Sequence, residues 1–169
     1  MPKEKLVILF SGVPGSSKTP ISHYLSWNFN LPIFNNDTMR TEVIEDHGVF
    51  DEEKYLVIRG ERLKKVLAKG MNFIYDASID RVWDELKPKL KENGYEFFLI
   101  NIELEKEFVR ILYKNKGYTW GLEFIDQLFN EHQQLIERHS ADINFKILQK
   151  DFNNRLELAK QAVGKLLAK

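Results

Sequence analysis

The chain has 169 residues, of which 43% are hydrophobic and 30% are charged, a composition typical of a globular domain with a sizeable core. Lys plus Arg and Asp plus Glu both total 25. The totals therefore show no basic excess of the kind that a long nucleic-acid partner requires. Cysteine is absent, which excludes disulfides, thiolate catalysis and cysteine metal sites.

No apolar run approaches the ~18 residues of a membrane span. The start, MPKEK, is not followed by an apolar stretch of signal-peptide type, because the next apolar run is short. We therefore expect a cytoplasmic protein with no membrane partner, folded as a single domain over residues 1–169. The oligomeric state is left open.

Apolar segments with strand composition alternate along the chain with stretches of helical spacing. The expected strands are KLVILFS (5–11), LPIF (31–34), NFIYDA (72–77), EFFLINI (96–102) and INFKIL (143–148). The expected helices cover 21–29, a stretch from about 38, 51–69, 80–93, about 104–114, about 122–138 and about 151–167. Alternating strands and helices predict an α/β fold with a parallel sheet of about five strands and helices on both faces.

The segment GVPGSSKTP (12–20) lies between the first expected strand and the first expected helix. The phosphate-binding loop has the consensus G-x-x-x-x-G-K-[ST]. Gly12, Lys18 and Thr19 match three of its four fixed positions, whereas Ser17 replaces the second glycine. The alternative is a tight strand-to-helix turn of similar composition. The residues predicted to bind the nucleotide are Gly12, Val13, Pro14, Gly15, Ser16, Ser17, Lys18 and Thr19.

Each part of this P-loop has an expected role in nucleotide binding. Successive backbone N–H groups, with the helix N-terminus behind them, would surround the phosphates of the nucleotide. Lys18 would neutralise the terminal phosphates, and the Thr19 hydroxyl would bind a magnesium ion that bridges them. The alternative for Thr19 is an ordinary helix-start threonine.

Polar residues also follow the second expected strand, at the edge of a parallel sheet where ligands bind. The sequence NNDTMR places Asp37 and Arg40 three residues apart, on one face of the next helix. Asp37 could accept the proton of an attacking hydroxyl while Arg40 holds a phosphate or orients the acceptor. The alternative is a helix-capping Asp with a solvated Arg.

Asp76 closes the third expected strand in the sequence YDAS. A carboxylate at this point could hold the magnesium ion through water, or position the acceptor. The alternative is a strand-end Asp that accepts hydrogen bonds from turn N–H groups.

The sequence RILYKNKGYTW gathers cations and aromatic residues in one segment. Arg110, Lys114 and Lys116 could act as charges on a mobile lid, about residues 113–121, since phosphoryl transfer depends on positioning and charge stabilisation. A basic helix C-terminus followed by a glycine stop is a compatible alternative. The four histidines show no paired metal-binding spacing, and we expect them to be surface or capping residues.

Taken together, GVPGSSKT, NNDTMR, FIYDAS and FFLINIELEKEFVR resemble the small P-loop kinases, often described as predicted kinases, that are related to polynucleotide kinase and zeta toxin. The resemblance covers about residues 5 to 150, in matching order and spacing. It implies a sheet of adenylate-kinase type with a lid, binding of ATP with Mg²⁺, and transfer of the terminal phosphate to an acceptor hydroxyl of a small molecule, a nucleoside or a nucleic-acid end.

The resemblance also assigns individual residues. Lys18 and Thr19 fall on the phosphate and metal residues, and Asp37 and Arg40 on the acceptor side. Asp76 falls on the aspartate that closes the third segment. By the same comparison, Arg110 corresponds to the first arginine leading into the lid. The expected catalytic residues are therefore Lys18, Asp37, Arg40 and Arg110, and the expected metal ligands are Thr19 and Asp76.

Three departures separate this chain from the family pattern. Ser17 replaces glycine, Lys114 and Lys116 stand where lid arginines are common, and Pro20 removes an N–H that the resemblance places near the α-phosphate. Unless the Ser16 or Ser17 hydroxyl substitutes, that loss weakens nucleotide binding. A nucleotide-binding module without turnover and a simple ATPase are therefore alternatives to the kinase.

Overall fold

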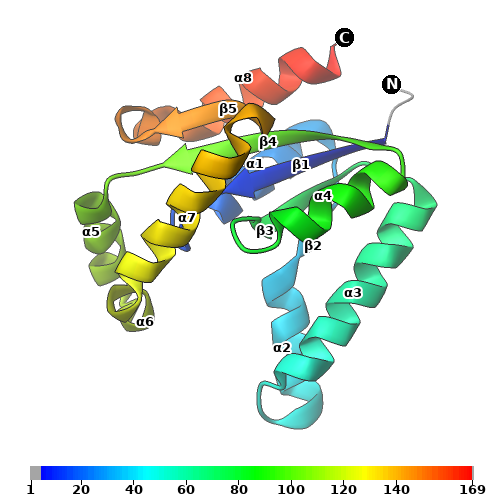
Figure 1. Ribbon diagram of the computed structural model, residues 1–169, viewed down its shortest axis with the longest axis horizontal. Coiled ribbons are helices and arrows are strands. Elements are labelled where there is room, and N and C mark those ends of the chain that lie inside the picture. Colours follow the sequence, from blue (N-terminus) through cyan, green and yellow to red (C-terminus); the bar gives the residue numbers. More distant parts are fainter. Residues whose placement is uncertain (1–4, 169) are drawn as a thin grey trace.

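The computed structural model describes residues 5–168, and at its centre lies a five-stranded sheet with the order β2-β3-β1-β4-β5 (Figure 1). The strands are β1 (Lys5–Ser11), β2 (Ile33–Asn35), β3 (Phe73–Ser78), β4 (Tyr95–Glu103) and β5 (Ile143–Leu148). All neighbouring strands run parallel, so their carboxyl ends meet at one edge of the sheet. The predicted α/β class with five parallel strands is confirmed.

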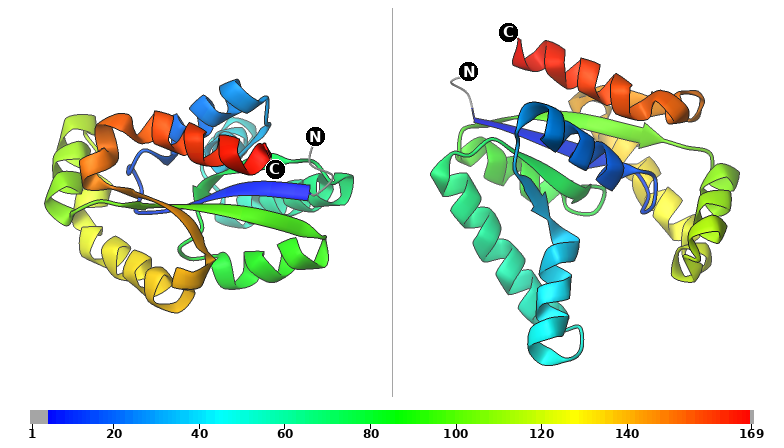
Figure 2. Two further views of the ribbon diagram at one scale, coloured as in Figure 1. Left: turned by 90° about the horizontal axis from the view of Figure 1, so that it is seen from above. Right: turned by 180° about the vertical axis from the view of Figure 1, so that it is seen from behind.

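Helices pack on both faces of this sheet (Figure 2). They are α1 (Lys18–Phe29), α2 (Asn36–His47), α3 (Glu52–Lys69), α4 (Trp83–Glu92), α5 (Lys106–Lys116), α6 (Thr119–Glu123), α7 (Ile125–His139) and α8 (Arg155–Leu167), with 3₁₀ segments η1 (Ser140–Asp142) and η2 (Gln149–Asn154). Helices α1 and α8 cover one face, and α3 and α4 pack on the other. Within residues 5–168, no helix is long and apolar enough to cross a membrane.

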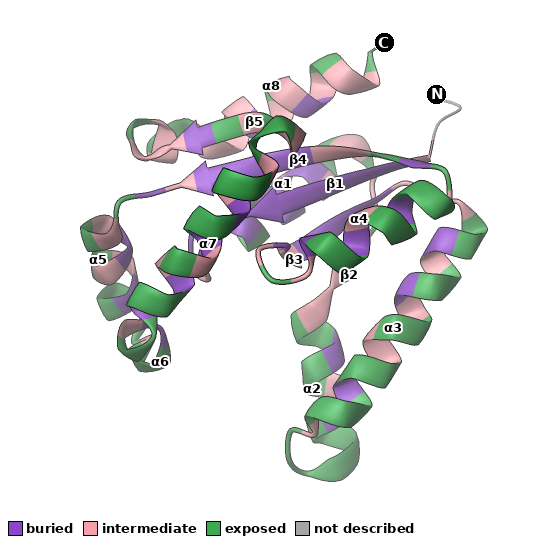
Figure 3. Ribbon diagram, in the orientation of Figure 1, coloured by how far each residue is buried: buried purple, intermediate pink, exposed green. Residues whose placement is uncertain are grey.

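The central strand β1 is buried on both faces, as its continuous apolar sequence predicts. Val7 and Leu9 belong to the core under α3 and α4, whereas Ile8 and Phe10 belong to the core under α1 and α8. All four side chains are completely buried, and the central strands form the buried interior of the molecule (Figure 3). This packing fixes the end of β1, where the P-loop begins.

The observed helices differ from the expected ones mainly near the candidate site. Helix α8 begins only at Arg155, because the preceding residues form the 3₁₀ segment η2. Helix α5 ends where Gly117 adopts φ +65°, a left-handed conformation that glycine tolerates. The short helix α6 then overlaps the end of the expected lid and extends past it to Glu123, and periodicity did not reveal this helix.

Leu9→Ala should lower the free energy of unfolding by about 2–5 kcal/mol, because the substitution leaves a cavity in a fully buried core. Chemical denaturation measures the change. Leu56→Ala is the matched control, since Leu56 is 49% exposed, and it should change stability by no more than about 0.5 kcal/mol. Equal losses in the two variants would contradict the burial described for β1.

Candidate active site

The P-loop, residues 12–19, joins the end of β1 to the first turn of α1. Gly12 has φ +141°, and a Cβ at this position would lie 2.9 Å from the carbonyl oxygen of Ile102. Gly15 has φ +74°, and a Cβ there would lie 2.8 Å from the ring of Tyr113. Both positions therefore require glycine.

Ser17 stands at the motif's second glycine position and adopts the conformation that glycine would take there. Its φ is 86°, in the left-handed region, which costs a residue with a side chain about 1–3 kcal/mol. The Ser17 Oγ accepts a hydrogen bond of 2.6 Å from Arg155 Nε. The substitution thus preserves the shape of the loop and adds a contact to α8.

Several backbone N–H groups of the P-loop are not used by the protein. The first residue of α1 whose N–H bonds to the preceding turn is Ile21, which donates to the Ser17 carbonyl oxygen at 3.3 Å. Within residues 5–168, the N–H groups of Gly15, Ser17, Lys18 and Thr19 have no hydrogen-bond acceptor. Unpaired N–H groups at a helix N-terminus bind phosphate, so this loop fits the phosphate chain of a nucleotide.

Lys18 is folded back onto its own loop. Its Nζ donates to the carbonyl oxygens of Gly12 at 2.8 Å and Val13 at 2.7 Å. Burial lowers the pKa of Lys18 to about 8, although the charge of the nearby Asp80 opposes that shift. The buried lysine therefore has only neutral acceptors in direct contact among the described residues, an arrangement that suits exchange for a phosphate oxygen.

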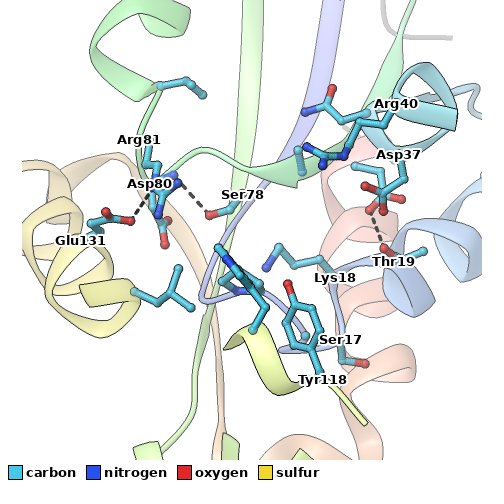
Figure 4. A pocket seen from close by; sticks show the side chains of 18 of the residues that line it. Ser17, Lys18, Thr19, Asp37, Arg40, Ser78, Asp80, Arg81, Tyr118 and Glu131 are labelled. Atoms are coloured by element: carbon cyan, nitrogen blue, oxygen red, sulfur yellow. Dashed lines mark hydrogen bonds and ion pairs between the residues drawn. The ribbon is translucent and has the colours of Figure 1, made fainter. Parts of the chain in front are cut away.

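Asp76, near the end of β3, is hydrogen-bonded to the P-loop residue Thr19, which lies close to Lys18 at the cavity (Figure 4). Its carboxylate accepts hydrogen bonds from Ser22 Oγ at 2.9 Å, Thr19 Oγ1 at 3.3 Å and Asn35 Nδ2 at 3.1 Å. Burial raises the pKa of Asp76, and the two hydroxyl groups oppose the shift. Magnesium prefers carboxylate and hydroxyl oxygens together with substrate phosphates. The pair Thr19 and Asp76 therefore fits the predicted magnesium ligands.

Asp37 lies in the first turn of α2 without capping that helix. The capping residue is Asn35, whose Oδ1 accepts from the N–H of Thr38 at 3.0 Å. The capping interpretation of Asp37 is therefore wrong. Its exposed side chain lines the same cavity as Lys18 and Thr19, and its negative charge contributes to the pKa of Lys18.

Arg40, one turn further along α2, is positioned by aromatic rings. Its guanidinium carbon lies 4.1 Å from the centroid of Phe50 and 5.8 Å from that of Tyr55. Such stacking holds a guanidinium in place while leaving its N–H groups available. Arg40 also lines the cavity, so the structure brings Asp37 and Arg40 to the P-loop.

The segment expected to form the lid packs directly on the P-loop. The hydroxyl of Tyr113 donates to the Pro14 carbonyl oxygen at 2.6 Å, and Lys116 Nζ donates to that of Gly15 at 3.2 Å. The ring of Tyr118 lies 5.0 Å from that of Tyr113, centroid to centroid. The completely buried Tyr113 thus ties α5 to the loop.

The cations of this segment do not all reach the site. Lys116 lines the cavity, but Arg110 and Lys114 are not among the described residues that line it. Arg110 Nε instead lies 3.5 Å from Glu107 on the same helix. The structure therefore does not bring Arg110 together with the other predicted catalytic residues.

Asp80 and His132 form a buried pair that sequence reasoning missed. Asp80 accepts from the N–H of Gly12 at 3.3 Å, and its other oxygen lies 3.0 Å from His132 Nδ1. Burial alone would raise the pKa of Asp80. The hydrogen bond and the electrostatic interaction with His132 instead hold this pKa below its usual range. The expectation of a surface or capping histidine is wrong for His132. Its spacing from Leu128 and Leu135, on the buried face of α7, is the signal that could have revealed it.

The cavity beside the P-loop has a volume of about 680 Å³, within the range of small-molecule sites. Residues of both charges line it. The cations are Lys18, Arg40, Arg59, Arg81 and Lys116, and the acids are Asp37, Asp76, Asp80 and Glu131. Arg81 and Glu131 neutralise each other, since Arg81 Nε lies 2.5 Å from Glu131 Oε2. No sequence pattern groups Arg59, Arg81 and Glu131 with the P-loop, because separate elements bring these residues to the cavity.

The sequence matches no protein-family model and no curated protein, whereas the fold matches solved structures over nearly its whole length. It is similar to a gluconokinase from Sinorhizobium meliloti (TM-score 0.64, 13% identity, 96% of this chain and 93% of that one). It is also similar to the Deinococcus radiodurans tunicamycin resistance protein (TM-score 0.64, 15% identity, 96% of both chains). A third similar structure is the shikimate kinase of Aquifex aeolicus (TM-score 0.59, 19% identity, 96% of both chains). The chain thus has the fold of the small P-loop kinases, as the sequence resemblance predicts.

Proposed function

We propose that the protein is an ATP-dependent phosphotransferase that moves the terminal phosphate of ATP to a hydroxyl group of a small molecule, a nucleoside or a nucleic-acid end. The observation that carries this proposal is the shared cavity. The P-loop lines one part of it, and Asp37 and Arg40 line another. A site that only hydrolysed ATP would not need an acid and a cation at the acceptor position. The similarity to a gluconokinase and a shikimate kinase supports the same conclusion.

On the nucleotide side, the unpaired N–H groups of the P-loop bind the phosphates. Lys18 exchanges the carbonyl oxygens of Gly12 and Val13 for oxygens of the outer phosphates. Thr19 and Asp76 are the residues that would hold Mg²⁺, which supplies positive charge where negative charge develops on the phosphates. No residue of this side forms a covalent bond to the substrate.

On the acceptor side, Asp37 accepts the proton of the acceptor hydroxyl as its oxygen bonds to the terminal phosphorus. The bond between that phosphorus and the bridging oxygen of ADP breaks, and ADP leaves with the bonding electrons. Arg40 orients the acceptor or the transferred group through its available N–H bonds. The exposure of Asp37 to the cavity suits this role, because an acceptor hydroxyl bound in the cavity can approach its carboxylate.

A nucleotide-binding module without turnover is the second candidate. It is favoured by the strained Ser17, by the missing N–H of Pro20 and by the position of Arg110 outside the cavity. Measuring ADP release with and without a panel of hydroxyl acceptors separates the possibilities. The kinase needs an acceptor, a simple ATPase releases ADP without one, and a binding module releases none.

Asp37→Asn should reduce acceptor-dependent ADP release by roughly 10²- to 10⁴-fold, the usual effect of losing a general base, and leave the Kd for ATP nearly unchanged. Asp46→Asn is the matched control, since Asp46 is an exposed acid on the same helix. Both variants should unfold at close to the wild-type temperature. An Asp37→Asn protein that transfers phosphate at the wild-type rate would contradict the assignment of the base.

The lowered pKa of Lys18 predicts that ATP binding takes up protons in mildly alkaline solution. Bound phosphates favour the charged lysine and raise its pKa above the value of about 8, so affinity should fall as the pH rises through that value. The uptake should be small at neutral pH and should rise toward one proton per ATP as the pH passes above the pKa of the free enzyme's Lys18.

Calorimetry in buffers with different ionisation enthalpies measures this proton uptake. Lys18→Arg is the control, because arginine stays charged throughout this range and its uptake should be near zero. Heats at pH 9 that do not depend on the buffer would show that Lys18 does not change its protonation on binding.

A further inference from the structure

Helices α1 and α8 lie side by side and run in the same direction (Figure 2). Two hydrogen bonds join these helices, between Arg155 and Ser17 and between Tyr24 and Glu157 at 2.7 Å. Near their ends, a Cβ at Gly164 would lie 3.6 Å from the ring of Phe29. The N-termini of both helices therefore meet at the P-loop. Each N-terminus carries partial positive charge, so this is a costly place for a cation and a favourable one for an anion.

A cationic side chain, that of Arg155, nevertheless lies where the two helix N-termini meet. Arg155 is the first residue of α8, and its guanidinium lies 4.2 Å from the ring centroid of Phe152. Its Nε donates to Ser17 Oγ at 2.6 Å, and its Nη1 donates to the Phe152 carbonyl oxygen at 2.6 Å. Partial burial lowers the pKa of Arg155. Its remaining N–H bonds have no recorded acceptor among the described residues.

The absence of a carboxylate partner sets Arg155 apart from most described arginines. Four described arginines have an acid within 4 Å. These ion pairs are Arg62–Glu42, Arg81–Glu131, Arg110–Glu107 and Arg138–Asp84. Within residues 5–168, Arg155, Arg40 and Arg59 have no such partner. Arg40 and Arg59 line the cavity, whereas Arg155 is not among the described residues that line it and instead contacts Ser17 of the P-loop. A guanidinium that has lost part of its hydration without gaining an acid is suited to a phosphate.

Pro20 creates the need for such a donor. Because Ile21 is the first residue whose N–H bonds to the preceding turn, the N–H groups at positions 18, 19 and 20 would all be available to phosphate. Proline has no N–H, so the loop has lost one phosphate donor. Arg155 lies at the same turn, bound to Ser17 three residues earlier.

We propose that Arg155 replaces the donor that Pro20 removes. Its unused N–H groups bind the nucleotide phosphate that lies against the first turn of α1, while its Nε–H bond holds Ser17 in the left-handed conformation. This inference rests on the proposed binding of ATP. It makes Arg155, outside the P-loop motif, a phosphate-binding residue of the nucleotide site.

A double-mutant cycle with Pro20→Ala and Arg155→Met tests the replacement. Calorimetry would give the Kd for Mg-ATP and for inorganic tripolyphosphate with magnesium. Arg155→Met should raise both Kd values by about 10- to 100-fold, the effect of losing a charged hydrogen bond. Pro20→Ala alone should change them by less than about threefold. In the Arg155→Met protein, Pro20→Ala restores an N–H and should recover roughly tenfold of the affinity.

Two further variants separate the contact from other effects. Arg138→Met removes one positive charge from an exposed position on α7 and should leave both Kd values unchanged. Arg155→Lys keeps the charge and the apolar stem over Phe152 but loses the planar donor, so its Kd should lie between those of wild type and Arg155→Met. If Arg155→Met unfolds early, Arg155→Lys carries the test.

Several results would overturn the inference. Wild-type affinity of Arg155→Met for both ligands would do so. A loss of affinity for ATP without a loss of affinity for tripolyphosphate would also do so, because it would place Arg155 next to the adenine base. Failure of Pro20→Ala to restore binding would show that the two positions act independently. If the wild-type protein binds neither ligand, the proposed function fails as well, and the two failures are thereby distinguished.

Discussion

The parallel pairing of β1 with its neighbours is the constraint on which the candidate site depends. Because every strand of the sheet runs the same way, the P-loop after β1, the first turn of α2 and the end of β3 meet at one edge. The register pairs Asn35 with Asp76, and that pairing places the Asp76 carboxylate beside the helix that carries Asp37. An antiparallel neighbour would send these groups to opposite edges.

A second level of organisation keeps the P-loop in a conformation that its sequence alone does not favour. Tyr113 and Lys116 hold the loop from α5, Asp80 holds the N–H of Gly12, and Arg155 holds Ser17. These contacts come from segments that are distant in sequence. They explain how a chain with serine at a glycine position keeps the left-handed turn, because each contact offsets part of the local strain.

The fold and much of the site could be predicted because their signals are local. Continuous apolar strands, helical spacing and the P-loop motif each lie within a short stretch, and the strand at Ile143–Leu148 was placed to the residue. Arg155 and Asp80 could not be found in this way, since their importance comes from tertiary contacts. Arg110 shows the opposite case: its position in the sequence matched the family, yet its side chain turns toward Glu107. Its expected catalytic role has no support in the geometry.

The most direct test of the account is a titration of the wild-type protein and of Lys18→Ala with Mg-ATP. If ATP binds through the P-loop, the wild type should bind one ATP per chain, and Lys18→Ala should show no saturable binding under the same conditions. Circular dichroism should show the same fold in both proteins, because within residues 5–168 the Lys18 side chain hydrogen-bonds only to groups of its own loop. Equal ATP affinity in the two proteins would contradict the assignment of this loop as the nucleotide site.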